Sequence, residues 1–362
     1  MAKTKGLCEI CSPKQWKTIS TDMLTDSGYP VYGANGIIGY YSEYNHGEST
    51  LLVTCRGATC GKLNICEPYS YVNGNAMALD NLIDEIDIKY LYYYLLNRGF
   101  EDVITGSAQP QIVRQSLQKV RVTYPDREKQ AEIVTALEKV SELITLRKEQ
   151  LAKLDQLVKS RFIELFETNP WKKVRAGTIM MNMRNGVSPS NAGTYPAKVL
   201  TLSAITQGDF DPSSWKDGMF DSDPPIEKRV TVSDFYMCRG NGNKNLVGAG
   251  AYSKEDRYDL VFPDTAIAAT IDLQQVCLPY LFHAWKRPSV REQIETGART
   301  TNGTYKINQG VVSNIELILP PLELQRQFAA FVEQTDKSKL AIQQSLDKLE
   351  LLKKSLMQEY FG

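Results

Sequence analysis

The sequence lacks a net charge and any long apolar run. Its 42 Lys and Arg residues equal its 42 Asp and Glu residues, so the formal charge of the 362-residue chain is zero. Because non-specific nucleic-acid binding depends mainly on neutralising phosphates, this balance excludes a strong, sequence-independent nucleic-acid binder acting alone. No stretch approaches the roughly 18 apolar residues that span a bilayer, and no apolar segment follows Lys3 and Lys5. We therefore expect a cytoplasmic protein without a membrane partner.

The cysteine pattern gives no support for a disulfide framework or a metal site. Seven cysteines are an odd number, and only Cys8 and Cys11 have the spacing of a metal-binding pair. A structural zinc site needs four ligands, which usually come as two such pairs. We expect reduced thiols and no bound metal.

Catalytic motifs are also missing. His46 and His283 are the only histidines, and neither has an obvious nucleophile nearby in the sequence. Gly57–Leu63 resembles a phosphate-binding loop, but it has three residues between its glycines and lacks the Ser or Thr that binds Mg²⁺. Asp223–Ile226 resembles the Asp-Pro-Pro-aromatic motif of amino-methyltransferases, but Ile226 cannot stack on a flipped base. We expect no catalytic centre in this chain.

An internal repeat dominates what the sequence does contain. Residues 120–166 align without a gap with residues 315–361, at an offset of 195, and twelve of the 47 aligned positions are identical. A fainter similarity upstream relates Pro13–Lys17 to Asn169–Lys173, at an offset of 155. The repeat predicts four segments: globular domains at 1–124 and 167–319, and helical segments at 125–166 and 320–362.

Each repeated tail is predicted to be a long helix. A proline precedes it, apolar residues recur at steps of three and four, and a continuous helix of this length would extend roughly 60 Å. The two tails are predicted to pair as an antiparallel coiled coil. The alternative is two surface helices, each packed on its own domain. The coiled-coil and partner-docking candidates are Ile133, Leu137, Leu151, Leu154, Phe328, Val332, Leu346 and Leu349.

The globular domains are predicted to be α+β. Leu51–Thr54 and Asp234–Cys238 are typical of buried strands, while Ile88–Asn97 and Leu278–Trp285 are typical of helices. The second domain has an additional loop at 207–225, rich in Gly, Asp and Pro.

Loops rich in Asn, Gln, Gly and Arg recur in both domains, and each domain has an Arg-Gly step after an apolar run, at Arg56 and Arg239. Asn and Gln can pair with adenine, and Arg with guanine, through two hydrogen bonds. Any one loop could instead be a solvated turn, and each arginine could pair with a carboxylate at a strand end. The DNA-binding candidates are Tyr32, Asn35, Arg56, Lys62, Ser107, Gln109 and Gln111 in the first domain, and Arg239, Asn241, Asn243, Lys244, Arg299, Thr301, Asn302, Tyr305 and Lys306 in the second.

Four stretches together resemble a known family. They are Pro125–Ile133, Pro320–Gln325, Gly106–Ile112 and Tyr29–Gly36. With these stretches the chain resembles, over nearly its whole length, the specificity (S) subunits of type I restriction–modification enzymes. It departs from the family at Pro125-Asp126, where two prolines are usual.

The resemblance implies two target recognition domains, separated by two helices, that each read one half of a split, asymmetric site in double-stranded DNA. It implies docking to two methyltransferase (M) subunits, which carry S-adenosylmethionine, and to restriction (R) subunits, which use ATP and Mg²⁺. No cofactor is then expected in this chain. The alternative function is a coiled-coil scaffold with two protein-binding domains and no sequence-specific DNA recognition.

Overall fold

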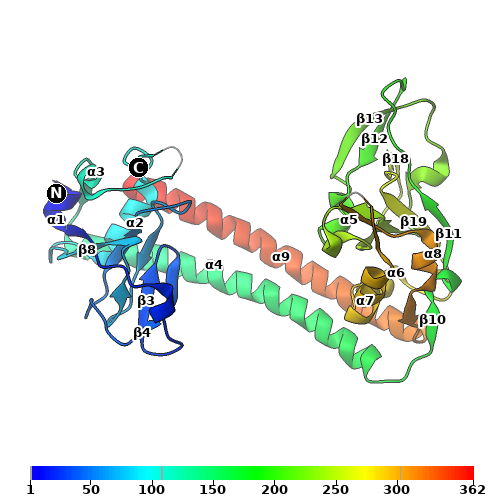
Figure 1. The fold of residues 1–362 in the computed structure, drawn as a ribbon, viewed down its shortest axis with the longest axis horizontal. Helices are drawn as coiled ribbons and strands as arrows, with labels where there is room; N and C mark the ends of the chain where they lie inside the picture. Colours follow the sequence, from blue (N-terminus) through cyan, green and yellow to red (C-terminus); the bar gives the residue numbers. More distant parts are fainter. Residues whose placement is uncertain (1, 107–108, 302) are drawn as a thin grey trace. The chain divides into compact units, whose positions relative to one another are not determined.

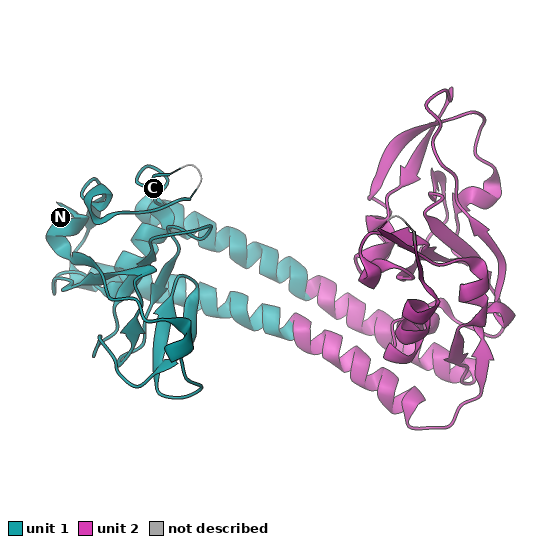
Figure 2. Cartoon of the chain, viewed as in Figure 1, with its two compact units in different colours: residues 1–150, 342–362 teal, residues 151–341 magenta. Residues whose placement is uncertain are grey.

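The computed structural model describes residues 2–106, 109–301 and 303–362. It contains two compact units, Met1–Gln150 with Ile342–Gly362 (unit 1) and Leu151–Ala341 (unit 2) (Figure 2). Two long helices, α4 (Arg127–Phe162) and α9 (Leu322–Phe361), labelled in Figure 1, each contribute one part to unit 1 and another to unit 2 (Figure 2). The division into four separate segments stays a prediction. No helix of the described residues is long and apolar enough to cross a membrane.

Unit 1 is built on a four-stranded sheet in the order β2-β8-β5-β6 and a three-stranded sheet in the order β4-β3-β7, and β1 pairs with β9. Its strands are β1 (Lys3–Gly6), β2 (Ser12–Gln15), β3 (Tyr29–Gly33), β4 (Gly36–Tyr41), β5 (Leu51–Thr54), β6 (Leu63–Ile65), β7 (Tyr71–Val72), β8 (Ala76–Asp80) and β9 (Arg121–Tyr124). Its shorter helices are α1 (Leu7–Ile10), η1 (Thr21–Met23), α2 (Ile88–Arg98) and α3 (Arg114–Leu117).

Unit 2 repeats this plan with more strands. Its sheets have the orders β11-β19-β15-β17, β13-β12-β18-β14 and β16-β21-β20, and β10 pairs with β22. The strands are β10 (Lys173–Arg175), β11 (Met180–Asn185), β12 (Tyr195–Leu200), β13 (Trp215–Phe220), β14 (Arg229–Val230), β15 (Asp234–Cys238), β16 (Gly240–Asn241), β17 (Gly250–Tyr252), β18 (Arg257–Val261), β19 (Ala266–Ile271), β20 (Arg299–Thr301), β21 (Thr304–Lys306) and β22 (Glu316–Ile318). The helices are η2 (Ile163–Glu167), η3 (Ala176–Thr178), α5 (Ser203–Thr206), η4 (Ile226–Lys228), η5 (Lys244–Leu246), α6 (Leu278–Trp285), α7 (Pro288–Gly297) and α8 (Gln309–Asn314).

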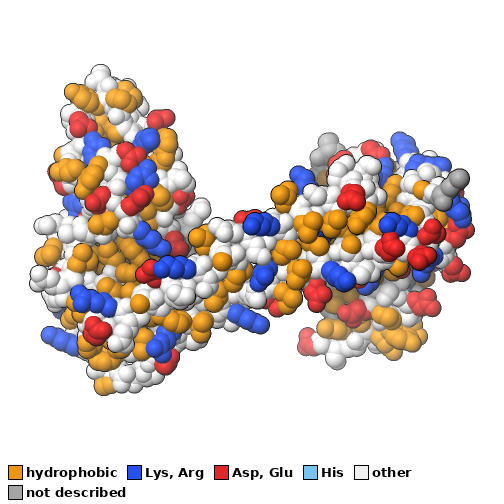
Figure 3. Space-filling view, turned by 180° about the vertical axis from the view of Figure 1, so that it is seen from behind, with side chains coloured by type: hydrophobic (Ala, Val, Ile, Leu, Met, Phe, Trp, Pro, Cys, Tyr) orange, Lys and Arg blue, Asp and Glu red, His pale blue; other side chains and the backbone are white. Residues whose placement is uncertain are grey.

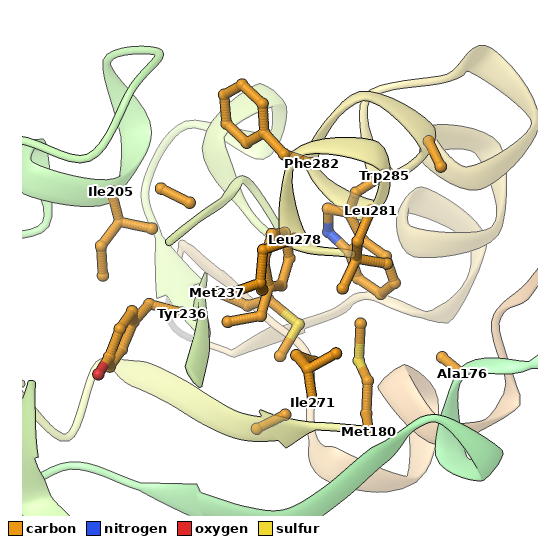
Figure 4. Packing of buried hydrophobic residues seen from close by; sticks show 14 of the residues in the cluster. Ala176, Met180, Ile205, Tyr236, Met237, Ile271, Leu278, Leu281, Phe282 and Trp285 are labelled. Carbon is orange, nitrogen blue, oxygen red and sulfur yellow. The ribbon is translucent and has the colours of Figure 1, made fainter. Parts of the chain in front are cut away.

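The apolar runs of the sequence form the central strands and their covering helices. The buried strands predicted at Leu51–Thr54 and Asp234–Cys238 are confirmed as β5 and β15, and the predicted helices are confirmed as α2 and α6. All residues of β5 and β15 are buried because both faces of their sheets are covered. In unit 2, Leu278, Leu281 and Trp285 of α6 lie on the side that faces the sheet residues Met180 and Met237 (Figure 4).

Two buried glutamines reveal how the repeat organises each unit. The side-chain Nε2 of Gln130 donates to the carbonyls of Glu85 and Pro125, and its Oε1 accepts from the N–H of Asp87 at 2.8 Å. Gln325 makes the corresponding three bonds, to Gln275, Pro320 and Cys277. Asp87 and Cys277 are the N-cap residues of α2 and α6. Each glutamine therefore fixes the start of a long helix to the start of the sheet-covering helix in the same unit.

Each unit also contains a contact between the start of one long helix and the end of the other. In unit 1, Met357 of α9 shares a hydrophobic cluster with Ile133 and Leu137 of α4. In unit 2, Phe162 of α4 lies edge-on to Phe328 of α9, with ring centroids 5.4 Å apart. Inside each unit the two helices are thus neighbours as well as parts of the unit's core.

The upstream repeat predicted at an offset of 155 is wrong. Strand β1 pairs with β9 and β10 pairs with β22, and the N–H of Leu7 bonds to Val120 as the N–H of Ala176 bonds to Ile315, both at 2.8 Å. The repeat therefore relates Leu7 to Ala176, an offset of 169. The alignment failed because these few residues match by type, whereas Pro13–Gln15 lie in β2 and Asn169–Lys172 precede β10.

The larger size of unit 2 comes partly from one connection. Ala34–Asn35 alone link β3 to β4 in unit 1, whereas the residues from Thr201 to Ser214, including α5, link β12 to β13 in unit 2. Part of the additional loop predicted at 207–225 lies in this connection, and the rest contains β13.

The half-buried histidine of unit 2, His283, predicts a loss of stability in acid. The His283 ring lies edge-on to Phe328 and Phe282, and burial lowers the pKa of His283 to about 4. Below its ordinary pKa of 6.5, the unfolded chain takes up a proton that the folded chain does not, so stability falls as the pH drops toward 4. Between pH 7.5 and pH 5 this loss should be about 2 kcal/mol.

Urea unfolding at the two pH values checks this expectation, with His283→Gln as the comparison. The variant keeps every carboxylate that also titrates in acid. Between pH 7.5 and pH 5 its free energy of unfolding should therefore fall by about 2 kcal/mol less than that of the original chain. Equal losses in both proteins would contradict the assignment.

Candidate nucleic-acid interface

Three loops that the sequence singled out in unit 1 are joined by backbone bonds and by one side-chain hydroxyl. The loop from Cys55 to Lys62 follows β5, and its Arg56 forms a β-bridge with Gln111 of the segment that precedes α3. The N–H of Gly57 donates to the carbonyl of Pro110 at 3.0 Å. The hydroxyl of Thr54 donates to the carbonyl of Ala34, in the turn between β3 and β4. These turns therefore form one continuous edge of unit 1.

Most of the candidate side chains at this edge are exposed. They belong to Asn35, Arg56, Lys62, Gln109 and Gln111. Among the described residues no carboxylate forms an ion pair with Arg56, so the alternative of a carboxylate-paired arginine does not apply there. Ser107 lies outside the described residues.

Tyr32 occupies a different environment from the one predicted. The tyrosine is only 6% exposed and packs with Leu52 and Val72, and its hydroxyl accepts a hydrogen bond from the N–H of Glu67 at 3.3 Å. Its position on β3 turns the ring toward the interior, whereas Asn35 in the following turn stays exposed. The prediction of a DNA-contacting ring at Tyr32 is therefore wrong for this conformation.

In unit 2 the small sheet β16-β21-β20 brings the candidates together. Gly240 and Asn241 of β16 pair with Lys306 and Tyr305 of β21, and Arg299 of β20 pairs with Lys306 from the other side. Lys306 and Arg299 are exposed, while Asn241 and Tyr305 are partly buried. The backbone of Thr301 lies in β20, its side chain lies outside what the structure describes, and Asn302 is not among the described residues.

Arg239 is oriented by the backbone beside it. Its Nη1 donates to the carbonyl of Asp264 at 3.2 Å, and its side chain is partly buried. As with Arg56, no carboxylate in the described part of the chain forms an ion pair with it. The guanidinium therefore retains donors for another acceptor.

Asn243 and Lys244 have local structural roles as well as exposed positions. The Asn243 carboxamide oxygen accepts from the N–H of Asn245 at 3.0 Å and caps the short helix η5. Lys244 forms an ion pair with Glu295 of α7 at 3.4 Å. Both residues remain exposed, and their contact with DNA stays a prediction.

Backbone bonds show that the two Arg-Gly steps are not equivalent. The N–H of Cys55 bonds to Asn75 and its carbonyl accepts from Ile112, while the N–H of Arg239 bonds to Thr265 and its carbonyl accepts from Ile307. Cys55 is thus the unit 1 counterpart of Arg239, and Arg56 is the counterpart of Gly240. The sequence match between the arginines is displaced by one residue.

The same comparison identifies a position that the sequence did not single out. Thr105 forms a β-bridge with Gln111, as Arg299 pairs with Lys306 in unit 2. Thr105 is exposed and lies beside the candidate segment 106–111. Only the strand pairing relates it to Arg299, because a Thr and an Arg share no recognisable sequence pattern.

The thiol at the centre of the unit 1 edge is structural. Burial raises the pKa of Cys55, so the thiol is protonated at neutral pH. It donates to the carbonyl of Asn75, with a sulfur–oxygen distance of 3.2 Å.

In space-filling view, charges of both signs are interspersed on the visible faces of both units, in agreement with the zero net charge (Figure 3).

Parts of the chain are similar to known proteins. The family model for the type I restriction modification DNA specificity domain matches residues 1–156. The chain is 28% identical over 146 residues to the EcoprrI type I restriction enzyme specificity subunit of Escherichia coli. That alignment covers 39% of this chain and 36% of the relative, so it spans about a third of each protein.

Solved structures support the fold over the whole length. A type I restriction–modification S subunit from M. genitalium matches with a TM-score of 0.65 at 15% identity, and the match covers 100% of this chain and 96% of that one. A chain from a structure that describes complex assembly and conformational transition of the type I R-M system matches with a TM-score of 0.59, also at 15% identity, over 99% of this chain and 97% of the other. Residues 1–156 thus resemble a type I restriction modification DNA specificity domain, and the whole chain has the fold of the two solved proteins.

Proposed function

We propose that this chain reads a bipartite, asymmetric DNA sequence, with one half-site contacted by the turns of unit 1 and the other by the small sheet of unit 2. The observation that carries the proposal is the shared backbone scaffold at the two edges. Cys55 and Arg239 make equivalent bonds, while the side chains that follow them differ. A common scaffold with different side chains suits two readers with different base preferences.

The zero net charge favours a reader that works inside a larger complex. Phosphate contacts supply most of the affinity for DNA, and this chain offers no excess of cations. We propose that two M subunits, which carry S-adenosylmethionine, supply both the chemistry and part of the DNA clamp. R subunits with ATP and Mg²⁺ would join for cleavage. This chain would then be a non-catalytic, cytoplasmic component without its own cofactor.

The two long helices suit the roles of spacer and docking surface. We propose that α4 and α9 pair as an antiparallel coiled coil that sets the distance between the half-sites. Ile133, Leu137, Phe328, Val332 and Leu346 are buried, which suits a seam, and Leu151, Leu154 and Leu349 are partly buried. Half-sites about one helical turn apart would place both readers on one face of the duplex.

The proposal predicts a half-site-specific effect of Arg239. Replacing Arg239 with Ala should weaken binding by about tenfold to a hundredfold, since a two-bond contact between arginine and guanine is worth about 1–3 kcal/mol. The loss should disappear on DNA whose unit 2 half-site is already mutated. Arg56→Ala should give the reciprocal result with the unit 1 half-site.

The experiment uses the complex of this chain with its M subunits, on a target first mapped by genome-wide detection of N6-methyladenine. Arg257→Ala is the matched control, because Arg257 pairs with Asp259 on β18, which is not a strand of the candidate sheet. An equal loss on both half-sites would indicate a folding role for Arg239. Binding that ignores DNA sequence altogether would favour the protein-scaffold alternative.

A further inference from the structure

Unit 2 contains a pocket of about 600 Å³ that the proposed DNA-reading role does not use. Small-molecule sites commonly have volumes of about 300–1,000 Å³. Its apolar lining comes from both long helices, from α6, from β17 and from the connection between β12 and β13, through Val158, Phe210, Tyr252, Phe282 and Val332. The ring of Phe282 points away from Leu281 and Met180, on the opposite side of α6 from the sheet core (Figure 4).

One wall of the pocket has no counterpart in unit 1. Gln207–Phe210 and Pro212 line the pocket and belong to the long connection between β12 and β13. The equivalent connection in unit 1 is the two-residue turn Ala34–Asn35. The pocket is therefore a feature of the second unit and not a by-product of the repeated framework.

Four of the eight charged residues that line the pocket neutralise one another in pairs. Asp155 pairs with Lys339 at 2.5 Å, and Asp336 pairs with Lys254 at 3.4 Å. Lys286, at the end of α6, forms no ion pair with any residue that the structure describes. It is thus an available cation at the edge of an apolar surface.

Lys286 is exposed as a residue, and its ammonium is held at the pocket by an aromatic ring. Its Nζ lies 3.5 Å from the centroid of the Phe282 ring, an arrangement that orients the cation over the aromatic face. Burial lowers the pKa of Lys286 below its ordinary value, and the nearby ammonium of Lys339 lowers it further, against the opposing effect of Asp209. A bound anion would relieve both unfavourable effects.

His283 adds a polar group to the same lining. The residue is half-buried and its ring is neutral at pH 7, and none of the described residues forms a hydrogen bond with its nitrogens. A neutral imidazole has one N–H donor and one acceptor. Together, Lys286 and His283 can hold an acidic group while the aromatic rings cover the apolar part of the same molecule.

We propose that this pocket binds a small organic anion, with a planar or branched apolar group against Phe210, Tyr252 and Phe282 and its acidic group on Lys286 and His283. The proposal is independent of which DNA sequence the chain reads. It gives unit 2 a ligand site that unit 1 lacks, in contact with both long helices.

The first test is a fluorescence titration of the full-length chain with 8-anilinonaphthalene-1-sulfonate, a planar aromatic sulfonate. We expect saturable binding of one molecule per chain. Lys286→Met keeps the length of the stem but removes the charge, so it should weaken binding by at least about tenfold. Lys216→Met is the matched control, since Lys216 is an exposed lysine of β13 that does not line the pocket, and it should bind like the original chain.

Equal affinities for all three proteins, or binding that does not saturate, would overturn the proposal. Circular dichroism and thermal unfolding that match those of the original chain would show that the variants are folded.

A second experiment localises the site without a substitution. Pyridoxal 5′-phosphate is added, its aldehyde condenses with a neutral amine to an imine with loss of water, and borohydride reduces the imine to a stable amine.

Peptide mapping of the reduced protein should find Lys286 modified before other lysines, because its lowered pKa leaves more neutral amine and the pocket accepts the aromatic ring. Excess naphthalene sulfonate should protect it. Modification spread evenly over exposed lysines such as Lys216, with no protection, would contradict the assignment.

Discussion

Replacing Gln325 with leucine should lower the free energy of unfolding by about 3–5 kcal/mol. The side chain is fully buried and makes three bonds to backbone groups, with its Nε2 2.8 Å from the carbonyl oxygen of Pro320 and its Oε1 3.0 Å from the amide nitrogen of Cys277. Leucine fills a similar volume but satisfies none of these groups. Each buried group left without a partner costs about 1–3 kcal/mol.

Urea unfolding measures this loss, and the repeat supplies a second case. Gln130→Leu removes the corresponding three bonds in unit 1 and should cost a similar amount. Gln343→Leu is the control, because Gln343 is exposed on α9 and its side chain donates to Asp347 nearby on the same helix, and it should change stability by less than about 0.5 kcal/mol. Equal stability of the three variants would show that the hydrogen bonds of Gln130 and Gln325 do not hold the long helices to their units.

The pair Gln130 and Gln325 illustrates what the sequence revealed and what it did not. Both residues are among the identical positions of the repeat at an offset of 195, yet the sequence did not indicate what they do. Their function depends on Asp87 and Cys277, the unlike N-cap residues of α2 and α6, which no sequence comparison would align. The backbone groups that they satisfy are independent of side-chain type, so only the structure shows the equivalence.

Long periodic segments were predicted well because many residues contribute to each. The helices α4 and α9 and the buried strands β5 and β15 all follow from apolar spacing. The upstream repeat failed because five residues around a tryptophan are too few to fix a strand register. Pairing of β1 with β9, and of β10 with β22, fixes that register through bonds far apart in sequence.

The sequence singled out loops that the structure brings together, and their contact with DNA stays a prediction. The loops rich in Asn, Gln and Arg do meet at one edge in unit 1 and on one small sheet in unit 2. Tyr32 was misplaced because a tyrosine beside a turn can face either side of its strand, and here it faces the core. Arg56 and Arg239 were treated as equivalent because their neighbours match by type, whereas the backbone bonds pair Arg239 with Cys55.

Removing the buried carboxylate of Asp234 should have an equally large effect on unit 2. Asp234 is 1% exposed and binds Arg184 through both oxygens, with the shorter contact at 2.5 Å. It also accepts hydrogen bonds from the hydroxyls of Thr231 and Thr270 at 2.9 Å. Asp234→Ala should reduce the free energy of unfolding by about 3–5 kcal/mol, because it leaves a mostly buried guanidinium without a counter-charge.

The double variant Asp234→Leu with Arg184→Met separates the loss of the pair from the cost of an unpaired charge. An apolar replacement of both partners should be more stable than Asp234→Ala, since neither charge then remains to be desolvated. A double variant that unfolds as readily as Asp234→Ala would instead show that packing around Asp234, and not the charge of Arg184, dominates the loss.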